Sequence, residues 1–257
     1  MQIDSSLFAF CSHGYVKIKI ADTNNLRLLR LKVMNVFKES LLANGLNAGM
    51  LERLDGLHNI LNLPDINNFR IDCIERLNAL EGFNARLLLD PLPDFFTSLF
   101  GPDQLIQKSV NLVIQRPADQ DNSELHRDYP GNSEFEIVVW IPMVNCPVDM
   151  SMYVLDFHRS VEVARGLERN AELGWDFLKQ RVKEHAKHIP VDFGEALVFM
   201  TPLFHGSNIN TTDRTRVSFN FRLKGLFYPC GMRDPYAFWS VLRTSAFTSR
   251  MLQDLHE

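Results

Sequence analysis

Cysteine is scarce in this sequence, and its spacing argues against two common ways of holding a small fold together. The 257-residue chain has four, Cys11, Cys73, Cys146 and Cys230, each far from the next. No Cys-x-x-Cys pair occurs, so neither a zinc knuckle nor a disulfide framework is indicated. We therefore expect four reduced thiols.

Long hydrophobic runs and blocks of like charge are also missing. The longest apolar run, Ile137 to Val144, is too short to span a bilayer and contains Pro142. No basic residue precedes an apolar stretch near the N-terminus, so we expect no secretory leader and a cytoplasmic location. The net charge is −4, which argues against nucleic-acid and membrane partners. Small molecules are the expected partners.

Several sequence signatures of other protein classes are absent. No internal repeat, low-complexity tract, phosphate-cradling glycine loop or serine or cysteine nucleophile motif appears. What is present is an ordinary globular composition, with 46% hydrophobic and 23% charged residues, so disorder is not expected. The length suits one large domain, and we predict a single domain over residues 1–257.

Two hydrophobic periods divide the chain. Apolar residues recur at helical spacing in some segments and alternate as in strands in others. Helices are predicted at residues 22–42, 49–61, 65–80, 94–99, 160–187 and 235–255, and strands at 15–20, 110–115, 135–141, 151–155 and 215–224, with a further strand after the Gly194-Glu195 turn. Late, closely spaced strands favour antiparallel sheets closed into a jelly roll.

The predicted fold class is therefore α+β, with a double-stranded β-helix of the cupin type as its core. Residues 1–106 would supply a first strand and an N-terminal helical layer, and residues 107–226 the jelly-roll core. Residues 160–187 would be a helical insertion in that core, and residues 227–257 a C-terminal helix that could form a homodimer contact.

A metal site is predicted from three residues. His126 and Asp128 are two residues apart, so on an extended strand both side chains point to the same face. A His-x-Asp pattern alone often arises by chance. One histidine from a later strand, for which His205 is the candidate, would complete the two-His-one-carboxylate set that holds non-haem Fe(II).

A carboxylate clamp is predicted beside this metal site. Arg216 follows His205 by 11 residues and can reach the same barrel mouth. Its guanidinium would bind a carboxylate through two charge-assisted hydrogen bonds. Ser218, two residues further along the same strand, could add a hydroxyl to the same oxygen pair.

These residues carry a resemblance to a known family. The sequence resembles the Fe(II)/2-oxoglutarate dioxygenases of the phytanoyl-CoA hydroxylase type, and among them the oxygenases of carbohydrate biosynthesis clusters. The matching stretches are Gly14-Tyr15-Val16, His126-Arg127-Asp128, Phe193-Gly194-Glu195-Ala196-Leu197, His205-Gly206-Ser207, Asn210 and Arg216-Val217-Ser218. Glu195 stands where such proteins often have aspartate, and Phe157-His158-Arg159-Ser160 stands where a Gly-Ser-His stretch is commoner.

The resemblance implies a hydroxylase. Fe(II) would be held by His126, Asp128 and His205, with 2-oxoglutarate and O2 as cosubstrates and the far carboxylate of 2-oxoglutarate on Arg216 and Ser218. Asp128 favours hydroxylation, since halogenating relatives lack the carboxylate ligand. The substrate would be a small polar metabolite, such as a sugar or sugar derivative.

Other residues leave alternatives open. Asn111 or Gln115 could contact 2-oxoglutarate, but a hydrogen bond within the sheet explains them equally well. Weaker candidates for substrate contacts are Arg127, Tyr129, Tyr153, Arg159 and Arg222. Two other readings of the whole chain are a cupin-like metal-binding protein or isomerase that uses the same triad without 2-oxoglutarate, and a scaffold in which the His-x-Asp is incidental.

Overall fold

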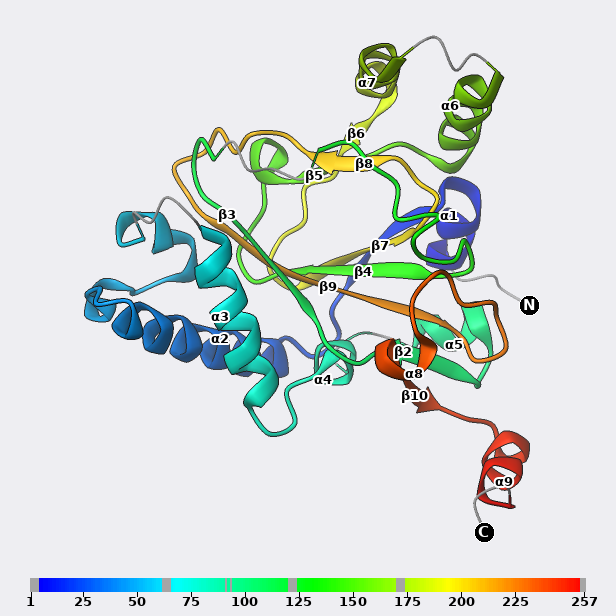
Figure 1. The fold of residues 1–257 in the computed structure, drawn as a ribbon, viewed down its shortest axis with the longest axis horizontal. Helices are drawn as coiled ribbons and strands as arrows, with labels where there is room; N and C mark the ends of the chain where they lie inside the picture. Colours follow the sequence, from blue (N-terminus) through cyan, green and yellow to red (C-terminus); the bar gives the residue numbers. More distant parts are fainter. Residues whose placement is uncertain are drawn as a thin grey trace.

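Two antiparallel sheets face each other at the centre of the fold (Figure 1). The computed structural model describes residues 5–61, 66–90, 92, 94–119, 124–169 and 174–254. The larger sheet has seven strands in the order β1-β7-β4-β9-β2-β10, with β3 also paired to β9, and the smaller sheet has the order β6-β5-β8. This arrangement confirms the predicted jelly-roll core.

The strands come from both ends of the chain as well as from its middle. Their bounds are β1 Tyr15–Lys19, β2 Gln104–Gln107, β3 Asn111–Gln115, β4 Ile137–Pro142, β5 Met152–Val154, β6 Lys187–His188, β7 Glu195–Met200, β8 His205–Ser207, β9 Arg216–Gly225 and β10 Trp239–Arg243. The predicted strands at 15–20, 110–115, 135–141, 151–155 and 215–224 are confirmed, with ends shifted by a few residues.

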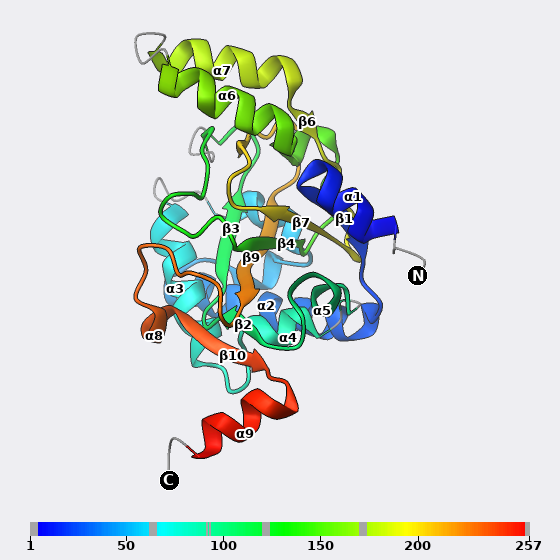
Figure 2. The same cartoon turned by 90° about the vertical axis from the view of Figure 1, so that its right-hand side faces the viewer.

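The helices lie around the sheets and at both ends of the molecule (Figures 1 and 2). Their bounds are α1 Ser5–His13, α2 Thr23–Ala43, α3 Ile66–Ala79, α4 Ala85–Leu89, α5 Phe95–Phe100, α6 Phe157–Arg169, α7 Gly174–His185, α8 Pro235–Phe238 and α9 Ala246–Asp254. Short 3-10 turns form η1 Ala48–Met50, η2 Leu54–Asn59 and η3 Val148–Met150. In the part of the chain that the structure describes, no helix is long and apolar enough to cross a membrane.

The central strands β4 and β9 give the larger sheet a buried apolar side and a polar inner wall. All six residues of β4 are buried between β7 and β9. On β9, Phe219 and Phe221 are fully buried on the core side. Because side chains alternate along a strand, Arg216, Asn220 and Arg222 share the opposite face. That face is the wall on which the candidate site is built.

The N-terminal helical layer packs through its apolar stripe. Helix α2 begins at the N-cap Asp22, whose carboxylate accepts the backbone N–H groups of Asn24 and Asn25 at 3.0 Å. Its buried Phe37 meets Phe69 of α3 edge-to-face, with ring centroids 5.5 Å apart. Helix α3 in turn contacts β3. The layer therefore covers the part of the sheet that carries β3.

The helix predicted at residues 49–61 was wrong. The structure has only the 3-10 turns η1 and η2 there. Leu51, Leu54 and Leu57 are all buried and recur every three residues, which is the period of a 3-10 helix. Gly49 and Gly56 further weaken an α-helix in this segment.

The single C-terminal helix predicted at residues 235–255 was also wrong. Strand β10 separates α8 from α9 and pairs with β2, placing Trp239 opposite Gln107. Edge pairing and the burial of Trp239 and Leu242 outweigh the helical spacing in the sequence. Helix α1, before β1, was not predicted at all.

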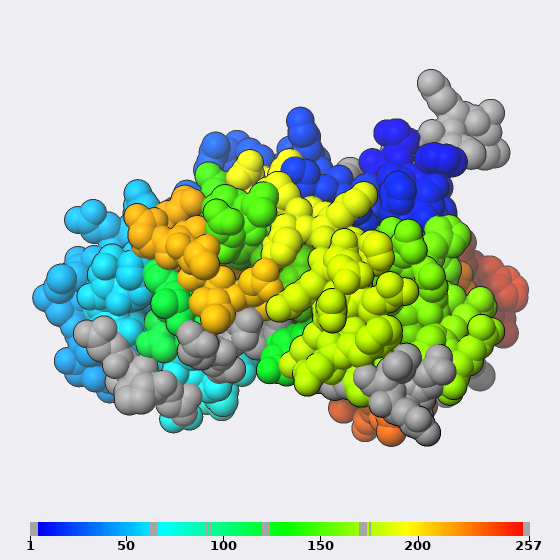
Figure 3. All heavy atoms as spheres, turned by 90° about the horizontal axis from the view of Figure 1, so that it is seen from above, coloured from blue at the N-terminus to red at the C-terminus, as the bar shows by residue number. Residues whose placement is uncertain are grey.

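The helical insertion predicted at residues 160–187 is a pair of helices, α6 and α7, and residues 170–173 lie outside the described residues. The pair stands at one end of the molecule, above the smaller sheet, and α9 stands at the other end (Figures 1 and 2). Figure 3, viewed from the insertion's side, shows α6 and α7 forming much of that surface. Their cluster includes Leu178, Val182 and Tyr153, the last from β5.

We expect Phe37→Ala to destabilise the protein by about 3–5 kcal/mol, because it removes a fully buried ring and leaves a cavity between α2 and α3. Urea unfolding measures this change. The matched control on the same helix is Leu28→Ala, at a side chain that is 57% exposed, with an expected change within about 0.5 kcal/mol. Equal effects of the two substitutions would contradict the packing described for α2.

Candidate metal centre

Backbone pairing brings His126 and His205 together. The two residues form an antiparallel bridge, in which each backbone N–H donates to the other's carbonyl at 3.0 Å. Residues directly opposite in such a pair project to the same side, and the two imidazole centroids are 4.2 Å apart. The structure thus joins two histidines that are 79 positions apart in the chain (205 − 126 = 79).

Asp128 joins them from a bend just after this isolated bridge, so His126 and Asp128 do not lie on the extended strand that the sequence predicted. The backbone N–H of Asp128 donates to the carbonyl of Thr201 at 3.1 Å. Oδ1 of Asp128 lies 3.8 Å from Nε2 of His126. One ligand atom from each of His126, Asp128 and His205 lies within 4.8 Å of the others. The predicted convergence is present in the structure, and the role of these residues as ligands stays a prediction.

Both imidazoles are held in the tautomer that leaves Nε2 available to a metal. Nδ1 of His126 lies 2.7 Å from the carbonyl of Glu124, and Nδ1 of His205 lies 2.9 Å from the carbonyl of Leu203. Because a carbonyl only accepts hydrogen bonds, each Nδ1 must carry the proton. Each Nε2 therefore keeps its lone pair for a cation, as in metal sites where a carbonyl orients the ligating histidine.

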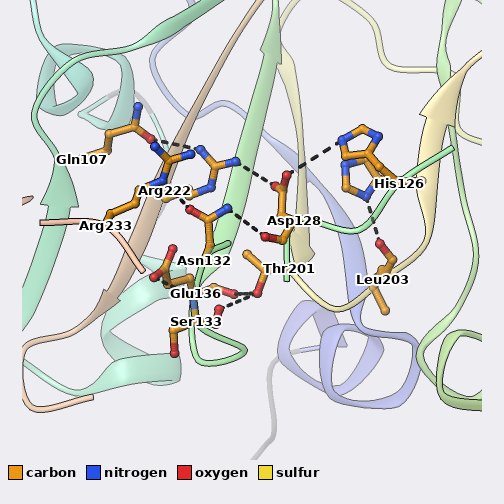
Figure 4. A network of polar contacts seen from close by, with 11 residues as sticks. Gln107, His126, Asp128, Asn132, Ser133, Glu136, Thr201, Leu203, Arg222 and Arg233 are labelled. Carbon is orange, nitrogen blue, oxygen red and sulfur yellow. Dashed lines mark hydrogen bonds and ion pairs between the residues drawn. The ribbon is translucent and has the colours of Figure 1, made fainter. Parts of the chain in front are cut away.

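Arg222 holds the carboxylate of Asp128 (Figure 4). Its Nη2 donates to Oδ2 at 2.9 Å, and its Nη1 lies 3.5 Å from Oε1 of Gln107. Burial opposes ionisation of Asp128, but the Arg222 guanidinium and the two neighbouring histidines outweigh it and hold the pKa of Asp128 below its usual value. Asp128 is accordingly a carboxylate at neutral pH.

The turn after Asp128 is tied to the C-terminal segment. Asn132 donates from Nδ2 to the Asp128 carbonyl at 3.0 Å and accepts at Oδ1 from Nε of Arg233 at 2.8 Å (Figure 4). Gly231 packs so closely here that a Cβ atom would lie 2.6 Å from the backbone of Asn132. Only glycine permits this approach, so the C-terminal segment helps to fix the position of Asp128.

A cavity of about 150 Å³ opens beside the three residues. Its apolar side includes Val138 and Phe199, and its polar side includes Asn111 and Asn220, which are opposite each other in the β3–β9 register. Arg216 and Arg222 also line it. The cavity can therefore take a small molecule that combines polar or acidic groups with a carbon skeleton.

Arg216 is buried in the wall of this cavity and has one N–H donor that is not used within the described residues. It is 3% exposed, and it donates from Nη1 to the Met150 carbonyl at 3.1 Å and from Nη2 to Oγ of Ser207 at 2.9 Å. Its Nε has no hydrogen-bond partner among the described residues. Burial lowers the pKa of Arg216 to about 10, which still leaves it positive at neutral pH. A buried, under-satisfied guanidinium suits an anionic ligand.

Two other residues expected at the site lie away from the cavity. Ser218 accepts a hydrogen bond from Nε1 of Trp140 at 3.0 Å, and Gln115 donates to the Asn208 carbonyl at 2.8 Å. Neither is among the cavity's lining residues. Trp140 itself lines the cavity, so Ser218 stands behind the indole. Ser207 takes the place beside Arg216 that was predicted for Ser218.

Asn111 does line the cavity, where Arg70 donates to its Oδ1 at 3.4 Å. The sequence reasoning missed Asn220 and the contact of Arg222 with Asp128. The strict alternation along residues 216–224 places Asn220 and Arg222 on the face of Arg216. That pattern could have identified both.

The remaining candidates for substrate contacts do not line the cavity in the described part of the chain. Arg127 stacks on the ring of Phe204 at 4.9 Å, and Arg159 pairs with Glu162 at 3.0 Å on α6. Tyr153 is buried under the insertion, and Tyr129 is partly exposed beside Arg127. Packing or surface contacts therefore account for these four side chains.

Comparison with known proteins supports the fold. No protein-family model and no curated protein match the sequence. Among solved structures, EctD from S. alaskensis in its apoform is 18% identical, with 95% of this chain and 87% of that one covered and a TM-score of 0.62. A nickel complex of the non-haem monooxygenase ThoJ is 17% identical over 98% and 94% of the two chains, with a TM-score of 0.55. The chain therefore has the fold of these two proteins.

HygX from Streptomyces hygroscopicus, solved with nickel and 2-oxoglutarate bound, is a further match. It is 12% identical over 89% of each chain, with a TM-score of 0.50. Identities this low establish a shared fold, and the chemistry of this chain must be argued from its own residues.

We expect His205 to make the metal-free protein less stable in acid. Burial lowers the pKa of His205 to about 4, and the nearby His126 adds to this effect. Between about pH 6.5, the ordinary histidine pKa, and pH 4, the unfolded chain binds a proton at residue 205 and the folded protein does not. The free energy of unfolding is therefore unaffected by this histidine above about pH 6.5 and falls as the pH drops toward 4.

Thermal melting of the metal-free wild type and His205→Gln between pH 7 and pH 4 tests this expectation. The melting temperature of the variant should fall less steeply with acidification, because it has no imidazole to protonate on unfolding. Parallel curves for the two proteins would show that His205 is not held neutral by burial.

Proposed function

We propose that this chain is a Fe(II)- and 2-oxoglutarate-dependent dioxygenase that hydroxylates a small polar metabolite. The observation that carries the proposal is the convergence of His126, Asp128 and His205 at a cavity whose wall also holds the buried Arg216. The first three residues are the donor set of a facial iron site. The fourth is a cation of the kind that receives a carboxylate.

The donor set fits a divalent metal such as Fe(II). Two Nε2 atoms and one carboxylate oxygen are available, and each donor group is oriented by a further contact: Glu124 for His126, Leu203 for His205 and Arg222 for Asp128. Such outer contacts are typical of ligands arranged for binding. The neutral state of His205 favours metal binding as well, since only the unprotonated ring can bind a cation.

The cavity fits 2-oxoglutarate on the same grounds. Arg216 would hold the far carboxylate with the donor that has no partner, Nε, and with its two terminal nitrogens. Asn111 would add a polar contact from the neighbouring strand. The near end of the molecule, which carries a carboxylate and a keto oxygen, would then lie toward His126, Asp128 and His205.

With metal, 2-oxoglutarate and dioxygen bound, the site would have the oxidising power to hydroxylate an unactivated C–H bond, with succinate and carbon dioxide as coproducts. The protein would bind, orient and shield. Phe199 packs against His205 with ring centroids 4.8 Å apart, and Val138 and Met152 add further apolar surface. This apolar side would limit the access of water to the reacting groups.

The substrate is proposed to be a polar small molecule, for which a sugar or sugar derivative is the leading class. Asn111, Asn220 and Arg222 line the cavity and offer amide and guanidinium groups to hydroxyl or acidic oxygens. The resemblance to oxygenases of carbohydrate biosynthesis points the same way. A cupin-like metal protein without 2-oxoglutarate would use the same triad, but it would have no use for the buried cation Arg216.

We expect the wild-type protein, mixed with Fe(II), 2-oxoglutarate and ascorbate, to release succinate slowly without its substrate. His126→Ala removes one of three metal donors and should abolish this turnover. Nickel binding measured by calorimetry should weaken in parallel. Wild-type protein that binds neither nickel nor 2-oxoglutarate would contradict the proposal.

We expect Arg216→Met to weaken 2-oxoglutarate binding without weakening metal binding. The variant should bind nickel as the wild type does and lose affinity for 2-oxoglutarate by about 10-fold or more, which corresponds to the loss of a charge-assisted hydrogen bond of about 1.5–3 kcal/mol. Arg214→Met is the matched control, because Arg214 lies two residues earlier and lines a different cavity. Unchanged 2-oxoglutarate binding in Arg216→Met would favour the cupin-like alternative.

A further inference from the structure

Arg222 contacts a proposed metal ligand in a way that restricts how that ligand can bind. It engages Oδ2 of Asp128 at 2.9 Å, and the two side chains are only 12% and 13% exposed. A buried pair of this kind resists separation, because breaking it leaves an uncompensated charge. Oδ2 is therefore occupied by Arg222, while Oδ1 is directed toward Nε2 of His126 at 3.8 Å.

The position of Arg222 is itself fixed from three sides. Its backbone lies in the middle of the sheet, on β9, opposite Val138 of β4. Its guanidinium lies between Gln107 of β2 and Asp128 (Figure 4). Gln107 is 6% exposed. The contact with Asp128 is thus made by a side chain that is anchored in the sheet.

The choice between one oxygen and two matters for the proposed chemistry. A carboxylate can bind a cation through either one or both of its oxygens. Two histidines and a one-oxygen carboxylate leave three coordination positions open, which is what a two-atom chelate of 2-oxoglutarate and dioxygen together require. A carboxylate bound through both oxygens would take one of those three.

We propose that Arg222 is a positioning residue that limits Asp128 to coordination through Oδ1 and so keeps the third position open. This inference rests on the proposed function, because it concerns the same metal and cosubstrate. Arg222 acts through Asp128 and need not touch the cosubstrate. Arg222, which the sequence offered only as a weak candidate for substrate contacts, would thus act on a metal ligand.

A simpler explanation makes a different prediction. Arg222 could assist only by its positive charge, which would attract any dianion to the cavity. A charge effect would weaken the binding of 2-oxoglutarate itself. A coordination effect would leave the two positions that the chelate needs and remove the third, so it would weaken only the binding of a diatomic gas beside 2-oxoglutarate.

The test compares two binding steps in the full-length protein. Calorimetry measures 2-oxoglutarate binding to the nickel-loaded protein, and anaerobic visible absorption measures the binding of nitric oxide, a stand-in for dioxygen, to the protein loaded with Fe(II) and 2-oxoglutarate. In Arg222→Met we expect nickel and 2-oxoglutarate still to bind, and the affinity for nitric oxide to fall by about 10-fold or more, because the third position is taken by Oδ2. Arg222→Lys, which keeps a cation at the position, should show a smaller loss of nitric oxide binding, and it serves if Arg222→Met does not fold.

Arg243→Met is the matched control, because Arg243 pairs with Asp94 at the same 2.9 Å on the surface. It should leave both affinities unchanged. Unaltered nitric oxide binding in Arg222→Met, or a loss of 2-oxoglutarate binding of the same size, would overturn the positioning role while leaving the proposed function intact. A wild-type protein that binds neither nickel nor 2-oxoglutarate would instead overturn the proposed function and this inference with it.

Discussion

The candidate centre depends on the backbone pairing of residue 126 with residue 205. Two hydrogen bonds of 3.0 Å join segments that are far apart in the chain, and they set the two imidazoles side by side before any ligand is bound. Asp128 follows because its own backbone pairs with Thr201. These backbone hydrogen bonds hold the two segments in place, and a rigid support gives a metal site its geometry. The side-chain contacts to Glu124 and Leu203 then only have to orient each ring.

Electrostatic balance is the second constraint. Strand β9 places the two cations Arg216 and Arg222 on one wall of a partly buried cavity. Arg222 is matched by Asp128, but Arg216 has no ion-pair partner among the described residues. A buried unpaired cation costs stability, and proteins accept such a cost mainly where a ligand will offset it. The anionic cosubstrate proposed here would be that ligand, and a metal triad by itself would not need this buried cation.

Much of the core and the triad could be predicted from the sequence, because both rest on local patterns. The alternation along residues 216–224 predicts the strand and its polar face, and the spacing of His126 and Asp128 predicts a shared direction. Details that depend on tertiary contacts could not be predicted. Strand β10 forms because an edge of β2 is available, and Ser207 replaces Ser218 beside Arg216 because Trp140 covers Ser218. The 3-10 turns at residues 48–59 were predicted as an α-helix because a three-residue spacing of leucines also fits one face of an α-helix.

The central claim is that one cavity holds both a metal and 2-oxoglutarate, in contact with each other. An anaerobic titration of 2-oxoglutarate into the Fe(II)-loaded protein, followed by visible absorption, tests it most directly. We expect a charge-transfer band that grows to a one-to-one ratio and is absent when either Fe(II) or 2-oxoglutarate is left out. No band, in a protein that binds Fe(II) and 2-oxoglutarate separately, would mean that the two do not meet in one cavity.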